Sequence, residues 1–185
     1  MLAQHFIDVT GVIALSLNIR ALVGASDRTM LKTTGWASAI WAMNNLLIGA
    51  YTAAALSALS VGRQASASML MDHPTRTKSI AFAVLVAATL SIAALTWNGI
   101  GTLFPVTGSL IASYAVLYMR GAALRWSMVL VSALWMYNAI AYDAWWQIAA
   151  NGLAGTAAAA GAMRARPVKP EECLAYQCSV DCVCA

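Results

Sequence analysis

The stretch from Gly35 to Leu70 is mostly apolar, and its length limits the folds that are open to this chain. One transmembrane helix needs only about 20 residues, so the stretch is long enough for two. We place the break at "GAYT", Gly49 to Thr52, because a glycine and an interfacial tyrosine suit a tight turn. The stretch therefore predicts two membrane-spanning helices joined by a short turn.

The whole chain shares this apolar character. Of its 185 residues, 61% are hydrophobic and 10% are charged, whereas a soluble domain has about 25% charged residues. A soluble fold of this size would lack the polar residues needed to cover its surface. The chain is therefore predicted to be an integral membrane protein. Its net charge of +4 is interpreted as a signal of membrane orientation and not of nucleic-acid binding.

Seven apolar segments can be assigned, which predicts an all-α protein with seven transmembrane helices. The segments are residues 4–19, 35–48, 53–70, 80–97, 106–119, 126–142 and 145–163. The stretch "NGIGTLFP", Asn98 to Pro105, is predicted to be a loop, and Asp143 is predicted to mark a tight turn.

The basic residues predict how these segments are oriented. With the N-terminus outside and seven helices following, all 11 Lys and Arg residues fall on the inner side. The outer side then holds Asp8, Asp143, Trp97 and Trp145. Basic residues collect on the cytoplasmic side of a membrane, so the C-terminus is predicted to be cytoplasmic. Arg63 lies within an apolar segment and is expected to snorkel to the inner surface.

The two halves of the chain share a motif. "SAIWAMN" matches "SALWMYN" after a shift of 94 residues, which superimposes Trp41 on Trp135 and Asn44 on Asn138. The first three segments then match the last three, and the fourth is a linker that makes the two three-helix units parallel. The predicted organisation is a first repeat over 1–72, a linker helix with its loops over 73–104, a second repeat over 105–165 and a cytoplasmic tail over 166–185.

This 3-1-3 arrangement resembles the SWEET, SemiSWEET and PQ-loop transporters. Trp41 and Trp135 before the outer turns, and the Asn151-Gly152 pair in the last segment, are similar to features of that superfamily. The closer resemblance is to the YgjV-like family of bacterial inner-membrane proteins. It rests on "LFPVTGSLIASYAVLYMRGAALRWSMVLVSALWMYNAIA", "LLIGAY" and "NGL", and it covers residues 4–165. The resemblances imply an inner-membrane protein with SWEET-like helix packing and a solute cavity between the repeats.

The Trp and Asn pairs have two interpretations. Positions i and i+3 share a face of a helix, so each Trp projects together with its Asn. In the first interpretation, Trp41, Asn44, Trp135 and Asn138 line a pocket, where Trp stacks on a ligand and Asn hydrogen-bonds to it. In the second, the Asn side chains join neighbouring helices and the Trp rings lie in the aromatic belt.

Other polar residues within the segments are also open to two interpretations. Asn151 and Ser60, at roughly equivalent positions, either line the pocket or hydrogen-bond to a neighbouring helix. His5 and Asp8, at the outer end of the first segment, either form a proton-coupling pair or act as interfacial caps.

The C-terminal segment "RARPVKPEECLAYQCSVDCVCA" holds all 4 cysteines, which are Cys173, Cys178, Cys182 and Cys184. On the cytoplasmic side disulfides are disfavoured, and four nearby thiolates could hold one soft metal ion such as Zn or Cu(I). The alternatives are a redox-sensitive tail, a palmitoylation site or a segment without a site.

No enzyme signature is present. The chain has 2 His residues and shows no paired carboxylates, phosphate-binding loop or nucleophile elbow. The sequence therefore predicts that the protein is not an enzyme. The favoured function is a SWEET-like carrier of a small polar solute, and the alternative is a non-transporting membrane protein whose cysteine tail binds a soft metal. The predicted partners are the lipid bilayer, the solute and further copies of the chain.

Overall fold

The computed structural model describes residues 2–23 and 27–164. These residues form seven α-helices and one short 3-10 helix, which confirms the all-α prediction. The α-helices are α1 (Leu2–Val23), α2 (Asp27–Leu47), α3 (Tyr51–Met69), α4 (Thr75–Leu95), α5 (Leu103–Tyr118), α6 (Gly121–Ala141) and α7 (Trp145–Arg164). The 3-10 helix, η1 (Ile100–Thr102), leads directly into α5.

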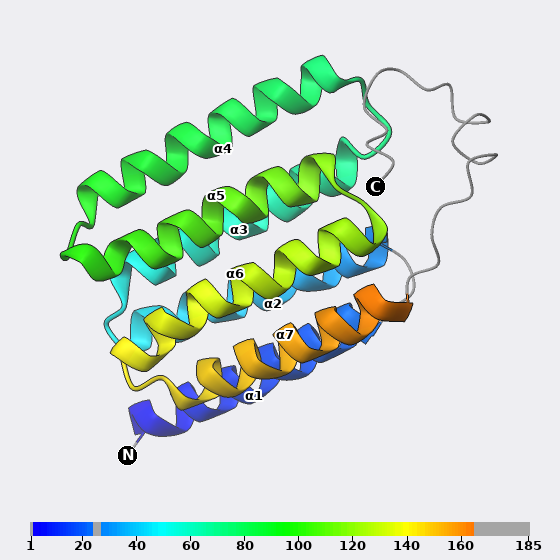
Figure 1. Ribbon diagram of the computed structural model, residues 1–185. Coiled ribbons are helices and arrows are strands. Elements are labelled where there is room, and N and C mark those ends of the chain that lie inside the picture. The colour runs from blue at the N-terminus through cyan, green and yellow to red at the C-terminus, as the bar shows by residue number, and fades with distance from the viewer. Residues whose placement is uncertain (1, 24–26, 165–185) are drawn as a thin grey trace.

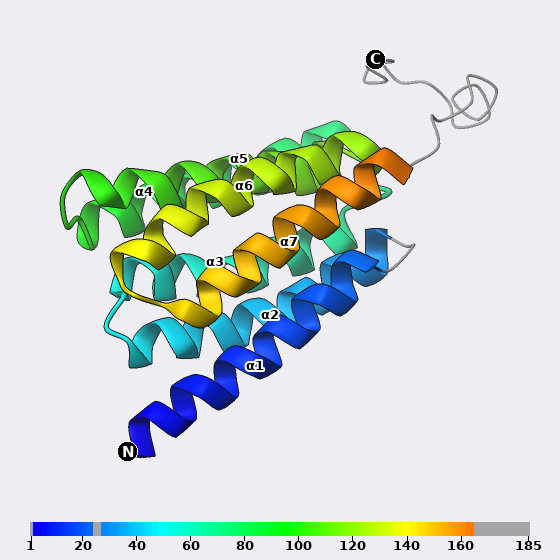
Figure 2. The same cartoon turned by 60° about the horizontal axis from the view of Figure 1, so that its bottom comes forward.

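Six of the helices lie in two layers of three, with α4 at one edge (Figure 1). In one layer α2 lies between α1 and α3, and in the other α6 lies between α5 and α7. The layers meet at both edges, where α7 packs on α1 and α5 packs on α3. Figure 2 shows the two layers one above the other. The outermost helix, α4, packs against α5 and α3. The central helices α2 and α6 therefore lie opposite each other.

The helix limits follow the shift found in the sequence. Both α2 and α6 are 21 residues long, and their first residues, Asp27 and Gly121, lie 94 positions apart. The first residues of α3 and α7, Tyr51 and Trp145, have the same separation. Corresponding helices of the two layers also run in the same direction (Figure 1).

The turns after α2 and α6 have equivalent backbone hydrogen bonds. In the first turn the N–H of Ala50 donates to the carbonyl of Asn45 at 2.9 Å, and in the second the N–H of Ala144 donates to the carbonyl of Ala139 at 2.9 Å. Each turn contains one residue in the left-handed backbone conformation, Gly49 at φ 78° in the first and Asp143 at φ 48° in the second. These turns lie where the sequence predicted them.

Several predicted helix limits were wrong. We expected α2 to begin at Gly35, but it begins at Asp27, and α4 and α6 also extend further toward their N-termini. The predicted limits followed the longest apolar runs, whereas α2 and α4 begin with polar turns before those runs. Tyr51, which we placed in the turn between the two helices, is the first residue of α3. The predicted loop up to Pro105 is also too long, because α5 begins at Leu103. Proline fits this first turn, where its missing N–H would have no intrahelical acceptor.

The surface of the described helices is rich in apolar side chains. Thr75–Leu95 and Ile100–Tyr118 are long and apolar enough to cross a membrane, and only 17% of the most apolar window of α4 is buried by the rest of the chain. Large hydrophobic side chains are exposed on all seven helices, for example Phe6, Trp36 and Leu130. Soluble monomers rarely expose apolar surface on this scale, whereas a lipid-facing surface requires it.

Candidate functional site

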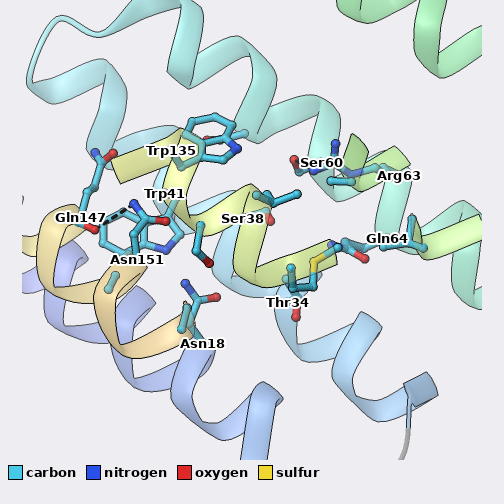
Figure 3. A pocket seen from close by; sticks show the side chains of 18 of the residues that line it. Asn18, Thr34, Ser38, Trp41, Ser60, Arg63, Gln64, Trp135, Gln147 and Asn151 are labelled. Atoms are coloured by element: carbon cyan, nitrogen blue, oxygen red, sulfur yellow. Dashed lines mark hydrogen bonds between the residues drawn. The ribbon is translucent and has the colours of Figure 1, made fainter. Parts of the chain in front are cut away.

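A cavity of about 160 Å³ lies between the two layers (Figure 3). Its walls come from α1, α2, α3, α5, α6 and α7, and they combine two indole rings with several amide and hydroxyl groups. Cavities on the order of 150 Å³ accommodate one benzene-sized molecule. The dimensions therefore suit a small solute.

The structure brings four of the six predicted substrate-binding residues to this cavity. Trp41 and Trp135 line it from α2 and α6, and Figure 3 shows both side chains around the same space. Ser60 on α3 and Asn151 on α7 also line it. The rings of Trp41 and Trp135 are partly buried at the centre of the molecule and do not form part of an outward-facing aromatic belt.

The structure places Asn44 in a contact between helices and not in this cavity. Its Nδ2 donates to the carbonyl of Ile7 at 2.9 Å and to Thr10 Oγ1 at 2.9 Å, both on α1. Its Oδ1 accepts a hydrogen bond of 3.3 Å from Gln147 Nε2 on α7. Asn44 thus joins three helices, as the second interpretation of the motif predicts.

Asn138 also lies outside the residues that line the cavity. It is buried in α6 with 5% of its surface exposed, and its Nδ2 has no hydrogen-bond partner within the described part of the chain. The face shared by i and i+3 therefore did not bring Asn44 or Asn138 into the site with the Trp rings.

Asn45 and Gln147 are cavity residues that the sequence analysis missed. Asn45 donates through Nδ2 to the carbonyl of Trp41 at 2.9 Å and accepts at Oδ1 from Gln147 Nε2 at 2.9 Å. Asn45 follows Trp41 by four positions, which is as close on a helix surface as three. The equivalent position in the second half is Ala139, so the repeat gave no signal for Asn45.

Arg63 corrects another prediction. We expected it to snorkel to the inner surface, but it is 4% exposed and lines the cavity from α3. Its Nη1 donates to the carbonyl of Ser109 at 2.9 Å and to Ser109 Oγ at 3.0 Å, and its Nη2 donates to Ser60 Oγ. These acceptors hold the guanidinium toward α5, across the boundary between the layers.

Asp8 lines a second cavity of about 290 Å³ at the N-terminal end of α1, and His5 is not among the residues that line it. Asp8 Oδ1 accepts hydrogen bonds from Trp146 Nε1 at 2.8 Å and from Gln4 Nε2 at 3.3 Å, while His5 is exposed. The bond to Trp146 ties α1 to α7. Proton coupling by His5 and Asp8 stays a prediction.

The four cysteines predicted to bind Zn or Cu(I), Cys173, Cys178, Cys182 and Cys184, lie outside the described residues. Among residues 2–23 and 27–164, no group of three or more His, Cys, Asp or Glu side chains is arranged to hold a metal ion.

Comparison with known proteins assigns the chain to a family. No curated protein and no solved structure matches it. The model of the Imp-YgjV family, described as bacterial inner membrane protein, matches residues 5–166. The match covers most of the chain, with α1 from residue 5 onward, the other six α-helices and the residues that line the cavity between the layers. The chain therefore belongs to the Imp-YgjV family of bacterial inner membrane proteins.

Proposed function

We propose that the protein is a multi-pass carrier of a small polar solute and that the cavity between the layers is its binding site. The proposal depends above all on Trp41 and Trp135, which occupy equivalent positions in α2 and α6 and line one cavity. In transporters built from repeats, the substrate site lies at the repeat interface.

The chemistry of the walls supports a polar solute. The amide side chains of Asn18, Asn45 and Asn151 line the cavity together with the two indoles. Amides supply both donors and acceptors, and an indole offers a broad apolar face. Such walls suit a ligand that has a polar edge and an apolar or ring-like body.

Contacts between helices near both ends of the bundle support alternating access. At one end, Trp146 Nε1 donates to Asp8 Oδ1 at 2.8 Å and joins the two layers. At the other end, Arg125 Nη2 lies 4.0 Å from Asp27 Oδ1 and joins α6 to α2. A carrier of this kind opens one end at a time by moving one repeat against the other.

The proposed topology has seven spans, an outer N-terminus and a cytoplasmic C-terminus. It is supported by the Lys and Arg residues of the described chain, which, apart from Arg63, lie near the end where α1, α3, α5 and α7 finish. A phosphatase that folds only in the periplasm is expected to be inactive when fused after Ala185 and active when fused after Trp97. The reverse pattern would refute the orientation.

The function is tested on the purified, full-length protein. A panel of sugars, amino acids, nucleosides and small organic acids is screened for a rise in Tm, because a ligand that binds the folded state stabilises it. Solutes that raise Tm are then offered to proteoliposomes. We expect one chemical class to raise Tm and to enter the vesicles. A class that binds but does not enter would refute the carrier and leave a binding protein.

A further inference from the structure

Arg63 is a buried cation at the edge of the cavity. Its side chain lies among neutral acceptors, which are Ser60 Oγ, Ser109 O and Oγ, and Ser113 Oγ at 3.4 Å. Its Nε has no hydrogen-bond partner within the described part of the chain. Hydroxyl and carbonyl oxygens satisfy hydrogen-bonding groups, but they do not neutralise a charge.

The carboxylates of the described residues lie in contacts that do not involve Arg63. Asp8 accepts from Trp146, Asp27 lies beside Arg125, and Asp72 forms an ion pair of 2.7 Å with the exposed Arg28. Asp143 occupies the turn between α6 and α7. No ion pair to Arg63 is present among residues 2–23 and 27–164.

An unbalanced buried charge is costly. A guanidinium stays protonated at physiological pH, so it cannot escape the cost by losing its proton. A guanidinium buried without a counter-charge is therefore stabilised either by moving into water or by binding an anion that is not part of the chain. In this chain the side chain is held inward by four serine oxygens, which leaves the cavity as the place for the anion.

The cavity offers a ligand one positive charge. Arg63 is the only charged side chain among the described residues that line it. The shift of 94 residues places Ala157 at the equivalent position of α7, so the second half adds no matching cation. The single positive charge of Arg63 can neutralise one negative charge of a ligand. A doubly charged anion would bury a second negative charge without a counter-charge, which is costly.

We propose that the cavity binds a small monovalent carboxylate whose charge is balanced by Arg63. The inference rests on the proposed function of the cavity as a solute site and names the chemical class of the solute. A carboxylate forms strong charge-assisted hydrogen bonds with arginine, and Arg63 lines this cavity. The apolar part of the acid then packs on the indoles of Trp41 and Trp135. The cavity volume of about 160 Å³ limits the acid to roughly the size of benzoate.

The test compares acids with neutral molecules of the same shape. Purified full-length protein in detergent is titrated with benzoate and propionate and, separately, with benzamide and propionamide at equal ionic strength. Sodium chloride alone controls for binding of any anion. The wild-type protein is expected to bind the carboxylates at least tenfold more tightly than the amides and to respond little to chloride.

Three variants locate the effect. Arg63→Gln is expected to abolish the preference for the carboxylate, whereas Arg63→Lys keeps the charge and a weaker preference because it lacks the planar fork. Arg28→Gln, at an exposed ion pair, is the matched control and is expected to behave as wild type. Without ligand, Arg63→Gln is expected to unfold at no lower temperature than wild type, because the variant lacks an unbalanced buried charge.

The outcomes separate this inference from the proposed function. Equal binding of acid and amide by the wild-type protein, or an unchanged preference in Arg63→Gln, would refute the carboxylate and leave a carrier of neutral solutes. Loss of Tm in ligand-free Arg63→Gln, with no acid preference in wild type, would make Arg63 a structural link between α3 and α5. If Arg63→Gln does not fold, the wild-type preference and Arg63→Lys decide the question. Failure of every solute in the screen would refute the carrier itself.

Discussion

The backbone N–H of Gly121 donates to Asp27 Oδ2 at 3.5 Å, and these two residues open α6 and α2 at equivalent positions of the two layers. Asp27 Oδ1 also lies 4.0 Å from Arg125 Nη2, one turn into α6. Burial lowers the pKa of the neighbouring Arg120, while the charges of Asp27 and Asp72 raise it. The carboxylate of Asp27 thus lies at the N-terminal turns of both α2 and α6, where the helix dipoles favour a negative charge.

Replacing Asp27 with Asn is expected to lower the free energy of unfolding by about 1 kcal/mol, because the amide loses its attraction to Arg125 and to both helix N-termini. The side chains of Arg125 and Asp27 are only 12% and 23% exposed, so water screens them less than the Arg28–Asp72 pair, at 50% and 76%. Denaturant unfolding in detergent measures the difference. Asp72→Asn is the control and should change stability by less than about 0.5 kcal/mol. Equal losses in both variants would contradict the assignment.

Gly11 marks the closest approach of α1 to α7. A Cβ at this position would lie 2.6 Å from Cγ of Trp146, whose indole N–H donates to Asp8 at 2.8 Å. Gly11→Ala must push the helices apart and is expected to cost about 1–3 kcal/mol, as overpacking does elsewhere. Gly62→Ala is the matched control, because a Cβ at Gly62 meets nothing within 4 Å and alanine favours a helix. A thermal-unfolding series in which Gly62→Ala is the less stable variant would overturn this account.

The sequence predicted those parts of the fold that depend on local or repeated signals. The turn residues Gly49 and Asp143 interrupt long apolar stretches, and the structure has turns at both places. Trp41 and Trp135 were found because the same motif occurs twice, and both line the cavity. These features can be seen in short windows or in the comparison of one half with the other.

The features that the sequence missed depend on distant partners. Arg63 is buried because Ser109 and Ser113, 46 and 50 positions later, accept its hydrogen bonds. Asn45, and not Asn44, faces the cavity because of the rotation that α2 adopts against α1 and α7. The local sequence does not predict this rotation, because Asn44 at i+3 and Asn45 at i+4 are equally close to Trp41 on the helix surface.

Trp41→Ala and Trp135→Ala are each expected to weaken binding of the solute by about tenfold or more, because each removes an indole wall worth on the order of 1.5 kcal/mol or more. Trp36→Ala, on the same helix as Trp41 but 72% exposed, serves as the control and should leave affinity unchanged. Calorimetric titration of the three folded variants gives the comparison. If Trp36→Ala weakens binding as much as the other two, the loss comes from the helix and not from the cavity.

Gln64 is expected to make the cavity selective for carboxylates that carry a hydroxyl group. It lines the cavity at 6% exposure, and its Oε1 has no hydrogen-bond partner among the described residues. Oε1 is enclosed by the protein, so a ligand hydroxyl reaches it once the Gln64 amide turns toward the cavity, and a hydrogen bond to such an acceptor is worth about 0.5–1.5 kcal/mol. Lactate is therefore expected to bind roughly threefold to tenfold more tightly than propionate.

The variant Gln64→Leu isolates this contact. It removes the buried unpaired oxygen, so the ligand-free protein should be no less stable than wild type, while lactate and propionate should then bind equally. Arg63 remains in place, so both acids should still bind more tightly than lactamide and propionamide. The measurement is the ratio of the two Kd values in each protein. A ratio that persists in Gln64→Leu would assign the hydroxyl to another acceptor, and a ratio of one in wild type would mean that Oε1 does not contact the ligand.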